Sequence, residues 1–204
     1  MNFNIVFGQI RVGIGAIRRS GVVSSLLGSR AVDVNGEPIP WLTYSAIHQL
    51  EDILNGSQAV VEFGSGQSSL WFAKRARSVV SIETDPAWAE RVESMARERG
   101  LNNVNVRVSA EFDPVQFGQL IADADIILID GPWRRESAEL ARARCKPGAY
   151  VVIDNTDPGA GGYGLPELFE GANRTIVKFR GLGPCLLHEW NTTICFPEWE
   201  RTRD

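Results

Sequence analysis

Short apolar runs alternate with helical patterns along most of the chain from residue 59 onward. Most of the runs are apolar on both faces, as buried parallel strands are, and they cover residues 59–63, 78–83, 103–109, 124–130 and 150–155. Helical patterns lie between them at residues 68–76, 86–100 and 136–145. The second begins at a typical N-cap, Asp85, followed by Pro86. The alternation predicts an α/β fold, a parallel sheet with helices on both faces.

The segments that flank this series follow other patterns. Residues 43–54 form an amphipathic helix whose buried side is expected to hold Ala46, Ile47, Leu50, Ile53 and Leu54. Residues 175–182 and 191–196 are two strands whose connection is too short for a helical crossover, so we expect them to be antiparallel. The glycine-rich residues 157–164 are a candidate lid.

Composition narrows the class of protein. The 204 residues, 44% hydrophobic and 23% charged, suit one soluble globular domain, and no segment approaches the ~20 apolar residues of a membrane span. A net charge of -4 argues against nucleic acid as a partner. Three cysteines, Cys145, Cys185 and Cys195, show neither disulfide nor zinc-ligand spacing, which favours a cytoplasmic location.

The first forty residues differ from the rest. They are apolar enough to suggest a signal peptide, but Arg11 interrupts the apolar run and no cleavage site of the usual kind follows. We therefore expect residues 1–40 to be an arm that packs on a domain formed by residues 41–204. The apolar arm is also compatible with a homodimer or a cap over the site.

Four of the five expected strands carry an acid at or near the carboxyl end. These acids are Glu62, Glu83, Asp130 and Asp154. Each alone is equally well explained as a helix cap or an ion-pair partner. Because ligands of open α/β sheets bind beyond the carboxyl ends of the strands, four acids at one edge predict a functional site there.

The turn after the first strand, "EFGSGQSS", predicts a nucleoside cofactor. Gly64 and Gly66 allow close approach of a ligand, and Glu83 follows Gly64 by 19 positions, the usual place of a ribose-binding acid. A dinucleotide usually requires a third glycine, here Ser69, and Glu62 would repel its pyrophosphate. The two cationic centres of S-adenosylmethionine suit an acidic pocket better.

These segments resemble the class I S-adenosylmethionine-dependent methyltransferases, of the small bacterial O-methyltransferase type. "EFGSGQS" and "SIETD" resemble the first two motifs, and "ADIILIDGP" and "KPGAYVVIDN" resemble the later strands. The resemblance implies a Rossmann-like seven-stranded, mostly parallel sheet with an antiparallel last strand. It also implies that the cofactor contacts Glu62, Gly64, Ser65, Gly66, Ser68, Glu83, Ser109, Ala110 and Asp130.

The same resemblance suggests a metal site and the kind of chemical group that accepts the methyl group. Asp130, Asp154 and Asn155 resemble the Mg²⁺ ligands of catechol-type O-methyltransferases, although the alternative is that they only shape their turns. The amino-methyltransferase signature, Asn or Asp before Pro-Pro-Tyr, is absent from "IDGPW". We therefore expect transfer to a hydroxyl of a small molecule, with a sugar or glycan precursor as one candidate.

Two residues are candidates for moving the proton of the acceptor. Asp130 is the stronger candidate, and His188 is the alternative because the ordinary pKa of histidine suits a base near neutrality. Two other functions stay open at this stage, a nicotinamide-dependent oxidoreductase and a non-catalytic module that retains the cofactor pocket.

Overall fold

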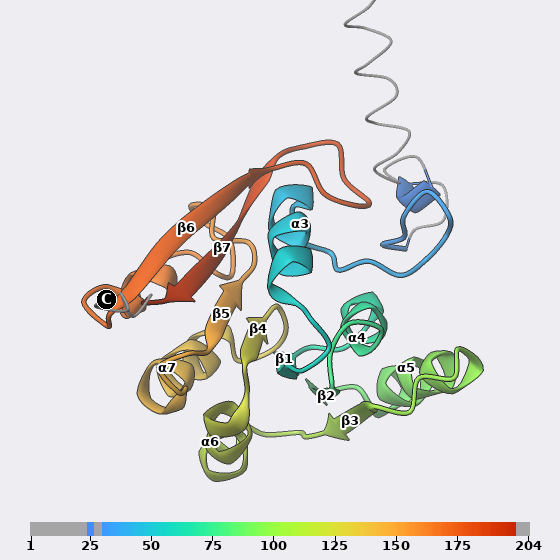
Figure 1. The fold of residues 1–204 in the computed structure, drawn as a ribbon, viewed down its shortest axis with the longest axis horizontal. Coiled ribbons are helices and arrows are strands. Elements are labelled where there is room, and N and C mark those ends of the chain that lie inside the picture. The colour runs from blue at the N-terminus through green and yellow to red at the C-terminus, as the bar shows by residue number, and fades with distance from the viewer. Residues whose placement is uncertain (1–23, 27–29, 199–204) are drawn as a thin grey trace, which may run out of the picture.

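A twisted sheet of seven strands forms the centre of the molecule (Figure 1). The computed structural model describes residues 24–26 and 30–198. The strand order is β3-β2-β1-β4-β5-β7-β6, with β1 to β5 parallel and β7 antiparallel to both of its neighbours. The predicted fold class, including the two antiparallel strands near the end of the chain, is confirmed.

The strand register brings the expected acids to one edge of the sheet. The strands are β1 (Ala59–Phe63), β2 (Ser78–Glu83), β3 (Val104–Val108), β4 (Ile126–Ile129), β5 (Tyr150–Ile153), β6 (Arg174–Gly181) and β7 (Trp190–Pro197). Phe63 at the end of β1 lies opposite Ile82 of β2 and Ile129 of β4. The turns that follow β1, β2, β4 and β5 therefore meet at the same edge.

Helices cover both faces of the sheet. They are α3 (Tyr44–Ile53), α4 (Gln67–Ala73), α5 (Pro86–Glu98), α6 (Pro114–Asp123), α7 (Arg134–Arg144) and a short 3₁₀ helix, η1 (Pro166–Phe169). Figure 1 shows α3, α4 and α5 on one side and α6 and α7 on the other. Trp71 and Phe72 of α4 fill the first core layer, and Phe117 of α6 and Phe169 of η1 fill the second. Both core layers are apolar, and they hold the helices against the two faces of the sheet.

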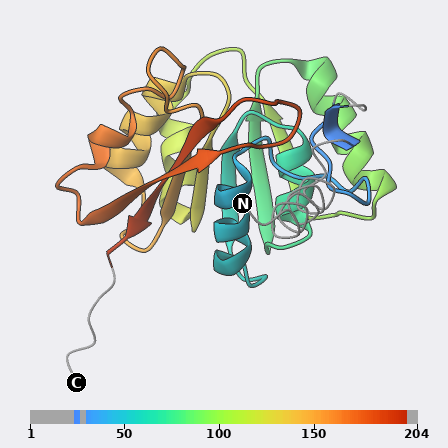
Figure 2. The ribbon, with the colours of Figure 1, turned by 90° about the horizontal axis from the view of Figure 1, so that it is seen from above.

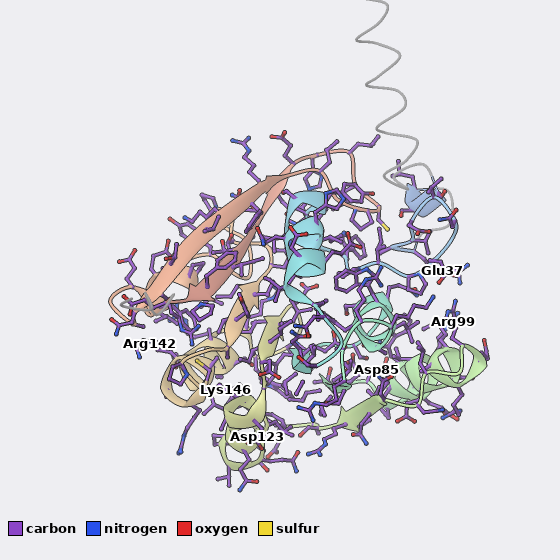
Figure 3. All side chains as sticks on the ribbon, in the orientation of Figure 1. Glu37, Asp85, Arg99, Asp123, Arg142 and Lys146 are labelled. Carbon is purple, nitrogen blue, oxygen red and sulfur yellow. The ribbon has the colours of Figure 1, made fainter. Side chains whose placement is uncertain are left out.

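Two helices begin with the same Asp-Pro pair. The Asp85 carboxylate accepts hydrogen bonds from the backbone of Ala87 (2.9 Å) and Trp88 (3.2 Å), which confirms the predicted start of α5. Asp85 and Arg99 mark the two ends of this helix in Figure 3. Asp113 caps α6 in the same way; no helix was predicted there, although the signal at Asp113 and Pro114 is identical.

The hairpin of β6 and β7 is fastened to the start of α3. The Thr43 backbone N–H donates to Thr192 Oγ1 (3.0 Å), and the Thr43 hydroxyl donates to the Phe179 carbonyl (3.1 Å). Figure 2 shows the hairpin reaching across this end of the helix. As predicted, Ala46, Ile47 and Leu50 of α3 are buried, whereas Ile53 and Leu54 are only partly so.

The predicted arm, residues 1–40, lies largely outside the described residues. In its described part, the Ser25 hydroxyl donates to the Val32 carbonyl (2.7 Å), and Ala31 and Ile39 belong to the core layer of α3. Whether residues 1–40 form a separate arm stays a prediction. No helix within the described residues is both long and apolar enough to cross a membrane.

Candidate active site

Two glycines bring the turns after β1 and β4 into direct contact. Gly64 has a positive φ of 97°, which favours glycine, and a Cβ at Gly131 would lie 2.5 Å from the Gly64 nitrogen and the Phe63 carbonyl oxygen. No side chain fits in that space. Gly131 was not predicted as a site residue, although it stands in the quoted "IDGPW" segment.

Glu62 is the buried centre of a serine cluster. Its side chain is 1% exposed and accepts hydrogen bonds from the hydroxyls of Ser68 (2.7 Å), Ser69 and Ser81. Ser69 also accepts from the Gly66 backbone N–H (3.0 Å). Burial raises the pKa of Glu62, an effect that the three serine hydroxyls oppose. The acid at the entrance of the turn therefore fixes the turn to β2 and α4.

Glu83 is held on both carboxylate oxygens. One accepts from the backbone N–H (3.1 Å) and hydroxyl (2.8 Å) of Ser65, and the other accepts from the backbone of Thr84 (2.7 Å) and Asp85 (3.1 Å). Ser65 in turn accepts a hydrogen bond on its carbonyl from Trp88 Nε1 (2.8 Å). This arrangement holds Glu83 in one orientation at the wall of the pocket, and its contact with a ribose remains a prediction.

A cavity of about 220 Å³ lies at this edge of the sheet. Most of the predicted cofactor residues line it: Glu62, Gly64, Ser65, Ser68, Glu83 and Asp130. Phe63, Leu128, Gly131 and Pro132 complete the wall, and none of these four was predicted. The pattern of apolar runs could not single them out, because it shows burial but not which strand-end residues face a ligand.

Two predicted adenine contacts lie beside this cavity rather than in its wall. The Ser109 backbone N–H donates to the Glu83 carbonyl (2.8 Å), and its hydroxyl donates to the Glu111 carbonyl (2.7 Å). Ala110 is exposed. The contacts of Ser109 and Ala110 with the adenine remain predictions.

A second cavity of about 200 Å³ adjoins the first. It is lined by Arg30, Ala31, Trp41, Ser65, Gly66, Gln67, Ser68, Trp88 and Asp130. The two cavities share Ser65, Ser68 and Asp130, and Asp130 is the only titratable residue in common. The predicted Gly66 lies in this second cavity, whereas Arg30 and Ala31 were missed because they belong to the segment assigned to the arm.

Arg134 joins the three residues that were expected to hold Mg²⁺. Its Nη2 donates to Asp130 Oδ1 (2.7 Å) and to Asn155 Oδ1 (3.2 Å), and its Nη1 donates to the Asp154 carbonyl oxygen (2.8 Å). Asp130, Asp154 and Asn155 therefore lie close together in space, whereas Arg134 was not among the predicted site residues.

The Asp154 carboxylate faces β7. Its Oδ1 accepts from Trp190 Nε1 (3.1 Å) and from the Thr192 hydroxyl, and the residue is 2% exposed. Burial, and secondarily the neighbouring Asp130 carboxylate, raise the pKa of Asp154 to about 7. Burial also raises the pKa of Asp130 to about 6, although the Arg134 cation opposes the shift.

The donors as arranged do not fit a divalent metal ion. Mg²⁺ requires several oxygen ligands with free lone pairs, at about 2.0–2.1 Å in an octahedron. Here Asp130 Oδ1 and Asn155 Oδ1 accept from a guanidinium, and Asp154 Oδ1 accepts from Trp190 and Thr192. Among residues 24–26 and 30–198, no group of three or more His, Cys, Asp or Glu side chains could hold a metal.

His188 lies in the loop between β6 and β7 and is exposed. Its ring centroid is 6.1 Å from that of Trp190, and it lines neither cavity. Its role as a base remains a prediction, with less support from geometry than that of Asp130.

Comparisons with known proteins agree with this arrangement. Residues 61–156, which contain the turns described above, match a family model described as a methyltransferase domain. A comparison with curated protein sequences finds no match.

Solved methyltransferase structures share the fold at low sequence identity. A precorrin-6y C5,15-methyltransferase from Geobacter metallireducens is 14% identical, with a TM-score of 0.57 over 74% of this chain and 86% of that one. An rRNA methylase from Streptococcus thermophilus is 11% identical, with a TM-score of 0.56 over 76% and 96%. A candidate methyltransferase from Streptococcus mutans, in complex with S-adenosylhomocysteine, is 9% identical, with a TM-score of 0.55 over 78% and 99%. The family model identifies residues 61–156 as a methyltransferase domain, and the shared fold is consistent with the class I S-adenosylmethionine-dependent methyltransferases.

Proposed function

We propose that this enzyme transfers the methyl group of S-adenosylmethionine to a hydroxyl group of a small molecule. The observation that carries the proposal is the position of Asp130, which lines both the cavity of the glycine turn and the adjoining cavity. A base at that boundary can take the proton of an acceptor hydroxyl beside the methyl group.

The chemical step is an in-line displacement. The acceptor oxygen forms a bond to the methyl carbon as the carbon–sulfur bond breaks, and the electron pair of that bond goes to sulfur to give neutral S-adenosylhomocysteine. The hydroxyl proton goes to Asp130. Arg134 binds one oxygen of this carboxylate, and the structure gives the other oxygen no hydrogen-bond partner among the described residues. The second oxygen is therefore suited to receive the proton.

The lining of the second cavity suits a ring-shaped, polar acceptor such as a sugar. Trp41 and Trp88 border it and are 47% and 36% exposed, so both side chains are partly accessible to a ligand. Arg30 adds a cationic donor on the same wall. Apolar faces combined with a few polar groups are typical of small-molecule sites. We propose that the acceptor lies between these tryptophans with its hydroxyl toward Asp130.

The test is S-adenosylhomocysteine release with paired acceptors that differ only in the reacting group, such as glucose-type and 2-amino-sugar derivatives of one series. We expect release with the hydroxyl compound and a loss of about 10²–10⁴-fold in Asp130→Asn, the usual effect of removing a general base. Asp123→Asn, a matched change at an exposed residue at the end of α6 (Figure 3), should keep the full rate.

Other outcomes would overturn the proposal. Release only with the amino compound, or full activity in Asp130→Asn, would contradict O-methylation assisted by Asp130. Binding of S-adenosylhomocysteine without turnover of any acceptor would instead favour the non-catalytic module.

A further inference from the structure

The Arg134 guanidinium lies at the point where the turns after β4 and β5 converge. Three oxygens from these turns accept hydrogen bonds from it, those of Asp130 (2.7 Å), Asn155 (3.2 Å) and the Asp154 carbonyl (2.8 Å). The Arg134 side chain is only 19% exposed. A permanent cation therefore sits among the three residues for which the sequence predicted a metal ion.

The backbone fixes this guanidinium from two sides. Arg134 is the first residue of α7, directly after Trp133, whose left-handed φ of 52° turns the chain into the helix. Gly161 of the glycine-rich loop packs on the arginine stem, since a Cβ there would lie 3.1 Å from Arg134 Cδ and 3.3 Å from Nε. The guanidinium is held in place by the fold and is not a surface group that happens to reach the acids.

A divalent cation could not share these oxygens with Arg134. An arginine is always protonated, and two cations within hydrogen-bond distance of the same oxygens repel strongly in a partly buried site. In addition, Asp154 Oδ1 accepts hydrogen bonds from Trp190 and Thr192, which direct this oxygen away from a metal shared with Asp130 and Asn155.

We infer that Arg134 is the resident cation of the acceptor site, a positioning residue that orients Asp130 and makes a divalent metal unnecessary. This inference rests on the proposed function in one respect: it assumes that the acceptor binds at the end of the pocket where Asp130 lies. A fixed guanidinium supplies one positive charge and a planar set of donors, and it leaves proton transfer to the carboxylate. Divalent metals should then neither bind nor be required.

The test is titration of MnCl2 into the purified full chain, followed by calorimetry and by the electron paramagnetic resonance signal of free Mn²⁺. Four proteins are compared: wild type, Arg134→Ala, Arg134→Lys and the control Arg135→Ala. Arg135 is the adjacent arginine, 63% exposed and paired only with Glu139 among the described residues. Arg134→Gln replaces Arg134→Ala if the latter does not fold.

We expect no binding to wild type, Arg135→Ala or Arg134→Lys. Arg134→Ala should bind Mn²⁺ at least about tenfold more tightly than the detection limit that wild type sets, because removing the cation frees Asp130 Oδ1, Asn155 Oδ1 and the Asp154 carbonyl oxygen. Binding of Mn²⁺ to wild type that is lost in Asp130→Asn would overturn the inference. So would a folded Arg134→Ala protein that gains no affinity, because these oxygens would then not form a cation site.

S-adenosylhomocysteine binding to the same samples separates this inference from the proposed function. Failure of wild type to bind that ligand would count against the methyltransferase site and leave the metal result standing. Normal binding of the ligand together with Mn²⁺ binding to wild type would count against the inference alone.

Discussion

Asp130 Oδ1 lies 2.7 Å from Nη2 of Arg134, one helical turn further along the chain at the start of α7. The two side chains are 27% and 19% exposed, so water partly screens the pair. Ion pairs with this much exposure contribute little to stability, about 0–1 kcal/mol. The main effect of the contact is therefore to orient Asp130. Arg134 holds one of its carboxylate oxygens, and the other is left to face the cavities.

We predict that methyl transfer increases with pH, with a midpoint near 6. Burial raises the pKa of Asp130 to about 6, and the carboxylate must be ionised to accept a proton. In Arg134→Ala the opposing cation is lost, so the midpoint should move to higher pH. The measurement is the rate of S-adenosylhomocysteine release from pH 5 to 8, with Arg135→Ala as the unchanged control. A profile that is the same in all three proteins would contradict this role of Asp130.

Asp154→Asn should be more stable than wild type at pH 8. The folded-state pKa of Asp154 is raised to about 7, above the value of about 3.9 in an unfolded chain, so the folded protein holds a proton that the unfolded chain releases. Its contribution to stability is greatest below pH 4 and is lost as the pH rises through 7. Asparagine can still accept from Trp190 and Thr192 without a buried charge.

Chemical unfolding of wild type and Asp154→Asn at pH 5 and pH 8 checks this prediction. The stability advantage of the variant should be larger at pH 8. A variant that is less stable than wild type at pH 8, or an advantage that is no larger at pH 8 than at pH 5, would contradict this prediction. Asp123→Asn is the control for a generic effect of the substitution.

Glu62→Ala should unfold at a markedly lower temperature. It leaves the hydroxyls of Ser68, Ser69 and Ser81, of which the last two are buried, without their common acceptor, at a cost of about 3 kcal/mol. Glu62→Gln keeps one acceptor oxygen and should lose less. Differential scanning calorimetry measures both, with exposed Glu90→Ala on α5 as the control. Equal melting temperatures for Glu62→Ala and the control would mean that the cluster does not support the turn.

The fold follows closely from the sequence because local signals determine most of its elements. The apolar runs at 59–63 and 78–83 coincide with β1 and β2, since buried strands need apolar residues on both faces. Helix α7 begins at Arg134, earlier than its apolar pattern, because its start depends on the left-handed Trp133. Such a backbone conformation has no clear pattern in a single sequence.

The site was predictable in part. Glu62 and Glu83 could be found because they end strands at fixed distances from the glycine turn. Arg134 could not be found in this way, because its role depends on the distance between two turns that lie far apart in sequence. The contact of Gly131 with Gly64 could not be predicted either, because it depends on the register of β1 and β4.

Gly131→Ala should abolish S-adenosylhomocysteine binding. The added Cβ would lie 2.5 Å from the Gly64 nitrogen and the Phe63 carbonyl oxygen, so the two turns must separate. Gly148→Ala is the matched control because nothing lies within 4 Å of its Cβ position. Calorimetric titration of the ligand into both variants checks this. Binding to Gly131→Ala with wild-type affinity would show that the close contact of the turns is not required.

The most direct measurement is thermal unfolding with S-adenosylhomocysteine, with NADH, or with neither, for wild type and Glu83→Ala. A ligand at a hundred times its dissociation constant adds about 2.7 kcal/mol, which raises the melting temperature of a domain of this size by about 5–10 °C. Exposed Glu111→Ala is the control. Our account predicts that rise with S-adenosylhomocysteine in wild type and the control, none with NADH, and a much smaller rise in Glu83→Ala. A rise with NADH alone, or an undiminished rise in Glu83→Ala, would contradict the assigned cofactor pocket.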